Sequence, residues 1–284
     1  MDRIKRLAAR LERVEPFRTG LAVNSRYGAD GGGQLAASLA YYAFLSLFPL
    51  ILLALAVVGF ILANDPEAQA DWAARLSESI PGFGPLIAEN IDALIDKRSG
   101  AGAIGAIGLL WSGTGLTNAG AFTMSRVFRA KEVEGILRKR LWSIAVTIGL
   151  GLAAAAGVVF SGVVGNRRAT GGLGIGLSLI AFAVSFVLDV GLFAVSYRVL
   201  SAGRGPPFRR LWPGALLAGG GWSILKIGGA WYATHTVARA SEVYGTFGSV
   251  VGVLAVLYIA AQLFLYGAEL NAVRCGIDEE PGTA

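Results

Sequence analysis

The sequence is poor in the residues from which soluble enzymes build reactive centres. Its 284 residues include one cysteine and one histidine, and 15% of them are charged, whereas an ordinary soluble domain has about 25% charged residues. A single cysteine cannot form a disulfide within the chain. The lone histidine, His235, cannot hold zinc by itself, and no group of Asp, Glu and His has metal-ligand spacing. We therefore expect no catalytic residue, no metal and no cofactor.

Apolar residues are correspondingly abundant. They make up 54% of the chain, and the mean hydropathy is +0.59. A bilayer core about 30 Å thick requires about 20 mostly apolar residues per helix. The sequence therefore predicts an all-α integral membrane protein with six transmembrane helices, over residues 35–63, 100–122, 141–165, 173–200, 212–234 and 247–272. The second run contains the polar stretch WSGTGLTNAG, so it is either a full span or a broken, re-entrant helix.

The distribution of charge predicts the topology. The net charge is +6 and the isoelectric point is about 9.7, values that also occur in nucleic-acid-binding proteins. However, basic residues gather before the first run, between the second and third, and between the fourth and fifth, whereas acidic residues gather in 64–99. Because basic residues favour the cytoplasmic side of a membrane, both termini are predicted to be cytoplasmic. No nucleic acid partner is expected.

Three parts lie outside the predicted spans. Residues 1–33 form a cytoplasmic leader with an amphipathic N-terminal helix, which either lies on an anionic leaflet or docks on the protein's own inner face. Residues 64–99 are predicted to form a periplasmic or extracellular cap of two short helices, or to bind an envelope protein. Residues 273–284 form a short cytoplasmic tail.

The first predicted span carries polar residues on one face. Ser38, Tyr42 and Ser46 recur every four residues. Pro49 lies in the same sector of the helix. It lacks an N–H to donate and clashes with the preceding turn, so it should kink the helix and leave the carbonyl of Leu45 unpaired. This face should point into the helix bundle, where its hydroxyls either bond to neighbouring helices or line a polar cavity.

The last predicted span repeats this pattern. One face carries Tyr258, Gln262, Tyr266 and Glu269. Glu269 lies about one turn from the cytoplasmic boundary, where a charge costs less than at the bilayer centre. We expect Glu269 to cap a neighbouring helix or to pair with an arginine such as Arg126 or Arg129, with gating as a lesser role.

Two further charges lie deeper in the predicted membrane region. Asp189 and Lys226 belong to consecutive spans, and at 1.5 Å per residue their depths differ by about 5 Å. Charges inside a membrane usually pair with one another or line water. The sequence favours an Asp189/Lys226 pair over separate bonding to backbone or water.

Four blocks of the sequence resemble the YihY/BrkB family of bacterial inner-membrane proteins. These blocks are AASLAYYAFLSLFPL, WSGTG, WPGALLAGGGW and YGTFGSVVGVLAVLYIAAQLFLYGAELNAV. The resemblance covers nearly the whole chain and implies a six-helix inner-membrane fold, but no established chemistry. The family has carried ribonuclease, virulence and serum-resistance labels, and some relatives look linked to lipid or lipopolysaccharide export. The chain departs from the family in its alanine- and glycine-rich composition and short tail, so functions that need a long tail are not implied.

Several functions are compatible with these features. The polar faces, the intramembrane charges and the 40 glycines favour a non-enzymatic translocator for a lipid or other envelope amphiphile, with membrane lipids as partners. The sequence contains no ATP-binding loop, so transport would be passive, gradient-coupled or partner-dependent. A scaffold for envelope assembly is one alternative. An intramembrane hydrolase is another, but Ser112 and Ser249 have no histidine at matching depth to activate them.

The proposed Asp189/Lys226 pair makes a prediction for stability. Removing one member of a buried ion pair leaves the other charge uncompensated, at a cost of about 3 to 5 kcal/mol. Asp189→Asn and Lys226→Met should each lower stability in detergent, whereas the double variant should recover much of the loss. Thermal unfolding of the four proteins tests this, and simple addition of the two losses would show that the residues are not partners.

Overall fold

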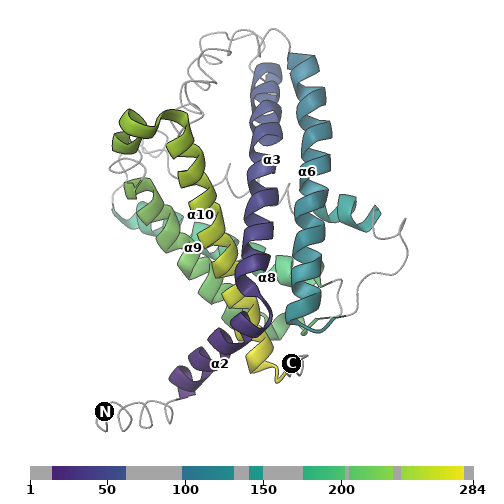
Figure 1. Ribbon diagram of the computed structural model, residues 1–284, viewed down its shortest axis with the longest axis vertical. Coiled ribbons are helices and arrows are strands. Elements are labelled where there is room, and N and C mark those ends of the chain that lie inside the picture. Colours follow the sequence, from purple (N-terminus) through teal and green to yellow (C-terminus); the bar gives the residue numbers. More distant parts are fainter. Residues whose placement is uncertain are drawn as a thin grey trace. The chain divides into compact units, whose positions relative to one another are not determined.

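The fold is entirely helical wherever the chain is described. A computed structural model describes residues 15–61, 98–130, 141–149, 175–201, 205–232 and 238–277, and these contain helices and turns but no strand (Figure 1). The helices are α2 (Glu15–Ala29), α3 (Gly32–Ile61), α6 (Arg98–Val127), a helix over 141–149, α8 (Ile175–Leu200), the 3₁₀ helix η1 (Phe208–Arg210), α9 (Trp212–Tyr232) and α10 (Ala238–Arg274). The predicted all-α class is confirmed.

Three of the described helices are long and apolar enough to cross a membrane. These stretches are Gly32–Leu52 in α3, Phe182–Leu200 in α8 and Val250–Arg274 in α10. They fall in the first, fourth and sixth predicted spans, which supports an all-α membrane protein; the full count of six remains a prediction. The first helix of the leader, the cap over 64–99 and most of the third predicted span lie outside the described residues.

The second predicted span is continuous. Helix α6 runs without interruption from Arg98 to Val127, so of the two alternatives for this stretch the structure has the unbroken helix. Some of its hydroxyls bond within the helix, since Ser112 Oγ donates to the Gly108 carbonyl at 2.9 Å and Thr123 Oγ1 to the Ala119 carbonyl at 2.8 Å. Others of its polar side chains bond to the helix over 141–149, where Thr117 meets Thr147 and Asn118 accepts from Ser143, each at 2.7 Å.

The chain divides into two compact units, and the boundary passes through four of the helices. Unit 1 comprises Met1–Ala37, Thr117–Ile224 and Ala260–Ala284, and unit 2 comprises Ser38–Leu116 and Leu225–Ile259.

In unit 1, small residues bring α8, α9 and α10 into backbone contact. A Cβ added to Gly214 would lie 1.9 Å from the Gly267 carbonyl oxygen, and one added to Gly267 would lie 2.5 Å from the Gly214 carbonyl oxygen. The fully buried Tyr197 of α8 donates its hydroxyl to the Phe264 carbonyl at 2.9 Å. Close approach of this kind is how membrane helices gain packing energy without a hydrophobic driving force.

Asn271 of α10 caps the start of α9. Its Oδ1 accepts from the Gly214 N–H at 2.8 Å, and its Nδ2 donates to the Leu211 carbonyl at 3.0 Å. The first N–H groups of a helix lack intrahelical partners, and Leu211, which precedes α9, has no side chain that can cap them. Asn271 is fully buried and supplies this cap from another helix.

In unit 2, α3 and α6 pack through two glycines. A Cβ at Gly115 would lie 2.6 Å from ring carbons of Tyr42, and a Cβ at Gly108 would lie 3.0 Å from the ring of Pro49. The two contacts lie seven residues apart on α3 and seven residues apart on α6, which is about two helical turns. The later residue of α3, Pro49, meets the earlier residue of α6, Gly108, so the two helices are antiparallel here.

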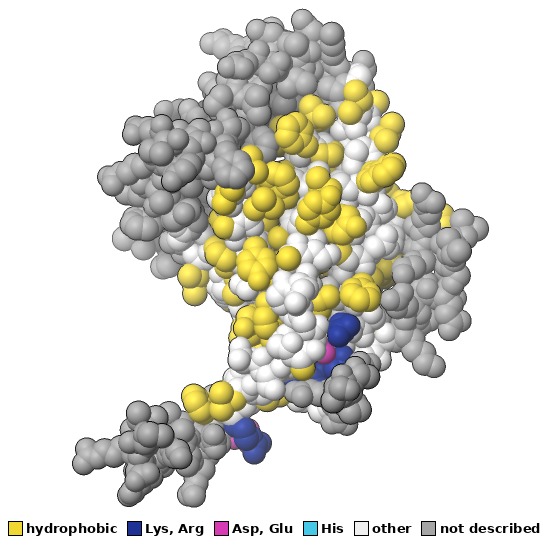
Figure 2. Space-filling model, in the orientation of Figure 1, with side chains coloured by type: hydrophobic (Ala, Val, Ile, Leu, Met, Phe, Trp, Pro, Cys, Tyr) yellow, Lys and Arg dark blue, Asp and Glu magenta, His cyan; other side chains and the backbone are white. Residues whose placement is uncertain are grey.

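The outward surfaces of both units are apolar. Unit 2 exposes Ile107 and Trp111, at 68% and 82%, and unit 1 exposes Val187 and Ile224, at 63% and 73%. Figure 2 shows hydrophobic side chains spread over one face of the helices, with the visible charged side chains gathered toward α2. Such surfaces are unusual on a soluble monomer and suit contact with lipid.

The tight α3/α6 contact predicts a position-dependent effect of adding one methyl group. Gly115→Ala should lower the free energy of unfolding by about 1 to 3 kcal/mol, because the Tyr42 ring must move. Gly100 lies on the same helix, and a Cβ added there would have no atom within 4 Å, so Gly100→Ala should be neutral or stabilising by up to about 1 kcal/mol. Thermal unfolding in detergent measures both, and equal effects would contradict the contact.

Candidate functional site

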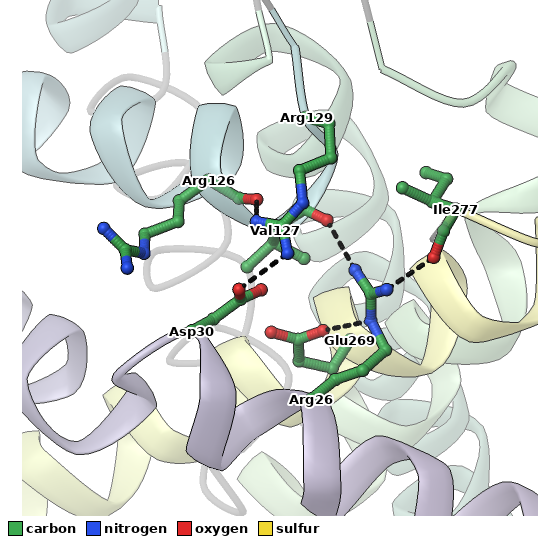
Figure 3. Close-up of polar contacts among 7 residues, drawn as sticks. All are labelled: Arg26, Asp30, Arg126, Val127, Arg129, Glu269 and Ile277. Atoms are coloured by element: carbon green, nitrogen blue, oxygen red, sulfur yellow. Dashed lines mark hydrogen bonds and ion pairs between the residues drawn. The ribbon is translucent and has the colours of Figure 1, made fainter. Parts of the chain in front are cut away.

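The ends of three helices meet in unit 1 around a buried group of charges. Arg26 and Asp30 come from the end of α2, Arg129 follows α6, and Glu269 lies in the last turns of α10 (Figure 3). The exposed fraction of Arg26 is 3%, that of Asp30 is 4% and that of Glu269 is 1%. We call these four residues the helix-end network.

Arg26 is the centre of the network. Its Nε donates to Glu269 Oε2 at 3.1 Å, its Nη2 donates to the Val127 carbonyl at 3.1 Å, and its Nη1 donates to the Ile277 carbonyl. Val127 is the last residue of α6, and Ile277 lies just beyond α10. Helix C-termini present unpaired carbonyls and a partial negative charge, so one guanidinium neutralises a carboxylate and two helix ends together.

The end of α10 is shaped to present the Ile277 carbonyl. Gly276 has φ +65°, its N–H donates to the Val273 carbonyl at 3.1 Å, and the Ile277 N–H donates to the Ala272 carbonyl at 3.1 Å. These bonds form a Schellman motif, in which glycine adopts the left-handed conformation without steric cost. The turn directs the chain back toward Arg26.

Arg129, in the turn that follows α6, has a backbone conformation that normally favours glycine. Its φ is +50°, and the following Ala130 N–H donates to the Ser125 carbonyl at 3.0 Å. A left-handed residue other than glycine costs about 1 to 2 kcal/mol. The side chain offsets this cost, because Arg129 Nη2 donates to Asp30 Oδ1 at 2.9 Å in a largely buried pair.

The two ion pairs form one electrostatic unit. The Asp30 carboxylate interacts with Glu269 as well as with Arg129, so two carboxylates share the field of two guanidinium groups. Removal of any one charge would leave the remaining three out of balance. Asp30 Oδ2 and Arg129 Nε have no hydrogen-bond partner within the described chain, so the network is balanced in charge without being saturated in hydrogen bonds.

Aromatic contacts reinforce the attachment of α2 to α10. The rings of Tyr27 and Tyr266 stack with centroids 4.3 Å apart and an interplanar angle of 6°, and the Tyr266 hydroxyl donates to Asn24 Oδ1 at 3.2 Å. Gly32, at the start of α3, gives the Tyr27 ring its space, since a Cβ there would lie 2.4 Å from the ring. The predicted site residue Tyr266 therefore belongs to the α2 contact.

Glu269 forms an ion pair with an arginine, but this arginine is neither of the two that the sequence analysis named as examples. Glu269 pairs with Arg26, not with Arg126 or Arg129. Arg129 binds Asp30 instead, and the exposed Arg126 points its guanidinium away from the network (Figure 3). Sequence reasoning missed Arg26 and Asp30 because it placed the leader helix before them and assigned them no partner. The signal in the sequence was an arginine and an aspartate, four residues apart, directly before a glycine turn.

The predicted polar face of α3 divides into different environments. Ser46 is buried, and its Oγ donates to the Tyr42 carbonyl of its own helix at 2.8 Å. Tyr42 and Pro49 pack on the α6 glycines described above. Ser38 is exposed. The hydroxyl of Ser46 therefore bonds within α3 rather than to a neighbouring helix, and a cavity-lining role for this face stays a prediction.

The remaining predicted site residues are not members of the helix-end network. Tyr258 and Gln262 are half-buried on α10, Asp189 is half-buried on α8, and Lys226 is exposed on α9. Asp189 belongs to unit 1 and Lys226 to unit 2, and their pairing stays a prediction.

The hydroxyl of Ser112, which the sequence offered as a nucleophile, is bonded to the backbone. It donates to the Gly108 carbonyl of its own helix. Within the described residues, no group of three or more His, Cys, Asp and Glu side chains is arranged to hold a metal ion. His235 and the side chain of Ser249 lie outside the described part of the chain.

The helical fold and its membrane-length apolar helices define a polytopic α-helical membrane protein. Residues 23–281 match the family model described as virulence factor BrkB. Because this match covers most of the chain, the protein belongs to the BrkB virulence factor family, as the sequence resemblance indicated.

Relatives of similar length carry different kinds of name. The chain is 28% identical to an uncharacterized protein of Dickeya dadantii, over 91% of this chain and 84% of the relative. It is 27% identical to the putative ribonuclease-like protein YfkH of Bacillus subtilis, over 88% and 92% of the two chains. It is 24% identical to the inner membrane protein YhjD of Escherichia coli, over 94% and 84%. No solved structure matches the chain.

The network predicts strongly coupled effects of mutation. Arg26→Met and Glu269→Gln should each lower the free energy of unfolding by about 3 to 5 kcal/mol, because each leaves a buried charge unpaired. Arg26→Met combined with Glu269→Gln should lose less than the sum of the two single losses. Chemical unfolding in detergent measures the coupling.

An exposed arginine of the same helix provides the control. Arg18 pairs with Glu15 at 3.4 Å, and these side chains are 73% and 85% exposed, so Arg18→Met should cost at most about 1 kcal/mol. Equal losses for Arg18→Met and Arg26→Met, or additive losses in the double variant, would contradict the network.

Proposed function

We propose that this protein is a non-enzymatic translocator that moves a lipid or another envelope amphiphile across the bacterial inner membrane, with both of its termini in the cytoplasm. The observation that carries this proposal is the local structure of α3 in unit 2. There, a buried serine hydroxyl, a proline and two glycine contacts follow one another along an apolar, membrane-length helix.

The proline and the serine both favour bending of α3. Pro49 cannot donate to the carbonyl of Leu45, one turn earlier. Ser46 Oγ adds a second bond to the Tyr42 carbonyl, and such back-bonding often bends helices. A helix that lacks one backbone hydrogen bond, and in which one carbonyl accepts from both a backbone N–H and a side-chain hydroxyl, bends more readily than a regular helix.

The contact with α6 allows such bending. Gly108 and Gly115 present backbone surface to Pro49 and Tyr42, so no α6 side chain interlocks with α3 at these points. Small residues let membrane helices approach closely, and a contact with backbone presents no α6 side chain that a bend of α3 would have to displace.

A bent membrane helix also offers polar groups at membrane depth. A backbone carbonyl that lacks a helical donor must be satisfied by protein, water or a ligand when it lies in the hydrocarbon region. The Leu45 carbonyl, together with hydroxyls such as that of Ser38, is suited to accept bonds from a lipid head group as it passes. The proposal therefore assigns α3 the role of the moving, head-group-contacting helix.

The proposal assigns no enzymatic activity to this chain. The hydroxyl of Ser112 donates to a backbone carbonyl, and the carboxylates of Asp30 and Glu269 are held in ion pairs. The word ribonuclease in the name of YfkH describes that relative. Residues in these arrangements are better suited to holding helices together than to general acid–base work.

Reconstituted protein tests the proposal. Vesicles of phosphatidylethanolamine and phosphatidylglycerol with a trace of NBD-labelled phospholipid are treated with dithionite, which reduces only label in the outer leaflet. Wild-type protein should let label from the inner leaflet be reduced over time. Pro49→Ala should slow this phase by about tenfold or more, because repairing a helix interrupted by proline stabilises the straight form by up to about 3 kcal/mol.

Pro213 provides a matched control. It lies in the first turn of α9, where proline disrupts no intrahelical bond, so Pro213→Ala should retain the wild-type rate. If wild-type vesicles behave like protein-free vesicles, lipid translocation is wrong and a scaffold role is favoured. An unchanged rate in folded Pro49→Ala would make the bend incidental.

A further inference from the structure

The connection between α8 and α9 presents two aromatic rings and two arginines together. Phe208 and Trp212 are 40% and 39% exposed, and their rings meet edge to face with centroids 5.7 Å apart. Arg209 and Arg210 lie between them in the chain and are exposed. Neither arginine forms an ion pair with a described residue. This cluster of four residues takes no part in the helix-end network.

Hydrogen bonds hold the backbone of the cluster in a fixed shape. The Arg210 N–H donates to the Pro207 carbonyl at 2.8 Å, and the Leu211 N–H donates to the Phe208 carbonyl at 3.1 Å. The side chain of Leu211 is completely buried, and its carbonyl accepts from Asn271 Nδ2. The exposed side chains therefore project from a short, anchored turn.

A second anchor lies just before the turn. Arg198, near the end of α8, donates through Nη1 to the Gly205 carbonyl at 3.1 Å and to the Pro206 carbonyl at 3.3 Å. The turn is thus attached to α8 on one side and to α10 on the other. A ligand that binds such a preorganised surface loses less conformational entropy in ordering it.

The position of the turn points to the boundary of the bilayer. It follows the membrane-length stretch Phe182–Leu200 and immediately precedes the apolar helix α9. Tryptophan and other amphipathic aromatic residues concentrate at membrane interfaces. Guanidinium groups bind phosphate oxygens through two parallel hydrogen bonds and keep their charge at every physiological pH.

We propose that Phe208, Arg209, Arg210 and Trp212 form a binding site for the phosphate head group of an anionic phospholipid in the adjoining leaflet. The arginines contact the phosphate, while the aromatic pair lies at the level of the glycerol backbone and the upper acyl chains. The N-terminus of α9 does not supply the anion site, because Asn271 already occupies the Gly214 N–H. Charge and aromatic surface together select a lipid over a free anion. This site does not depend on the proposed translocation.

Lipid titration of the purified full chain tests the site. Mixed detergent micelles with increasing dioleoyl phosphatidylglycerol should raise the unfolding temperature of the wild-type protein, whereas phosphatidylcholine and inorganic phosphate should raise it less. In Arg209→Gln/Arg210→Gln the apparent affinity for phosphatidylglycerol should fall about thirtyfold, which corresponds to about 1 kcal/mol per basic residue near an anionic surface.

Two further variants make the result specific. Arg18→Gln removes an exposed arginine of α2 and should keep the wild-type response to phosphatidylglycerol. Trp212→Leu keeps both arginines and should weaken the response to the lipid without creating one to inorganic phosphate. Native mass spectrometry of the same samples counts retained lipids and gives a reading that does not depend on unfolding temperature.

Specific outcomes would overturn the proposal. An unchanged phosphatidylglycerol titration in folded Arg209→Gln/Arg210→Gln would show that the arginines do not hold the head group. An equal effect of inorganic phosphate and phosphatidylglycerol on the wild-type protein would indicate a free-anion site, and an equal effect of phosphatidylcholine would indicate general solvation by lipid.

Discussion

The buried guanidinium of Arg26 is the interaction on which the described arrangement of unit 1 depends. Burial of a charge costs several kcal/mol unless its donors meet well-placed acceptors. Arg26 meets the Glu269 carboxylate and the carbonyls of Val127 and Ile277. These acceptors lie on α10, at the end of α6 and in the turn after α10. The position of α2 is therefore coupled to both other helix ends, since movement of any one would leave a buried polar group unpaired.

Around this network, several contacts of unit 1 have backbone as at least one partner. Gly214 and Gly267 bring the main chains of α9 and α10 together, Asn271 caps α9 from α10, and Tyr197 donates to a carbonyl of α10. Backbone contacts leave little room for side chains to adopt other rotamers. Unit 2 has a different character at α3 and α6, where the contact is made by a ring and a proline against glycines. The chain thus contains a tightly bonded part and a helix whose own bonding favours bending, a combination that supports the proposed transport role.

The family names alone do not define a chemistry for this protein. One relative is named ribonuclease-like and another is named for the inner membrane, and a shared fold hosts different functions. The geometry of the residues therefore carries the functional argument. The charged groups of the helix-end network are engaged with each other and with helix ends, whereas the arginines at 209 and 210 are exposed beside aromatic rings. The first arrangement suits a structural role, and the second suits recognition of an anionic surface.

Local properties of the sequence were sufficient to predict the class of fold. Helix length, apolar composition and the position of basic residues can each be judged from a stretch of about 20 residues. These properties predicted an all-α membrane protein. They also predicted that Glu269 would cap a neighbouring helix or pair with an arginine, because a carboxylate near the membrane boundary needs a partner. The kink of α3 at Pro49 was also read from the sequence, and it stays a prediction. The continuity of α6 did not follow, since a polar, glycine-rich stretch is compatible with either a straight or a broken helix.

Only the tertiary structure decided which residues meet. Arg26 lies 243 residues from Glu269 in the chain, and no periodic pattern relates residues at that separation. Arg126 and Arg129 were nearer to the expected membrane boundary, yet the turn that ends α6 directs Arg129 to Asp30 and leaves Arg126 exposed. Likewise, the sequence of Tyr42 and Pro49 predicted a polar, kinked face, but the pairing of these residues with Gly115 and Gly108 depends on how α3 lies against α6. The sequence determined which groups required partners, and the packing of the helices determined the partners, because that choice depends on distances that arise only after folding.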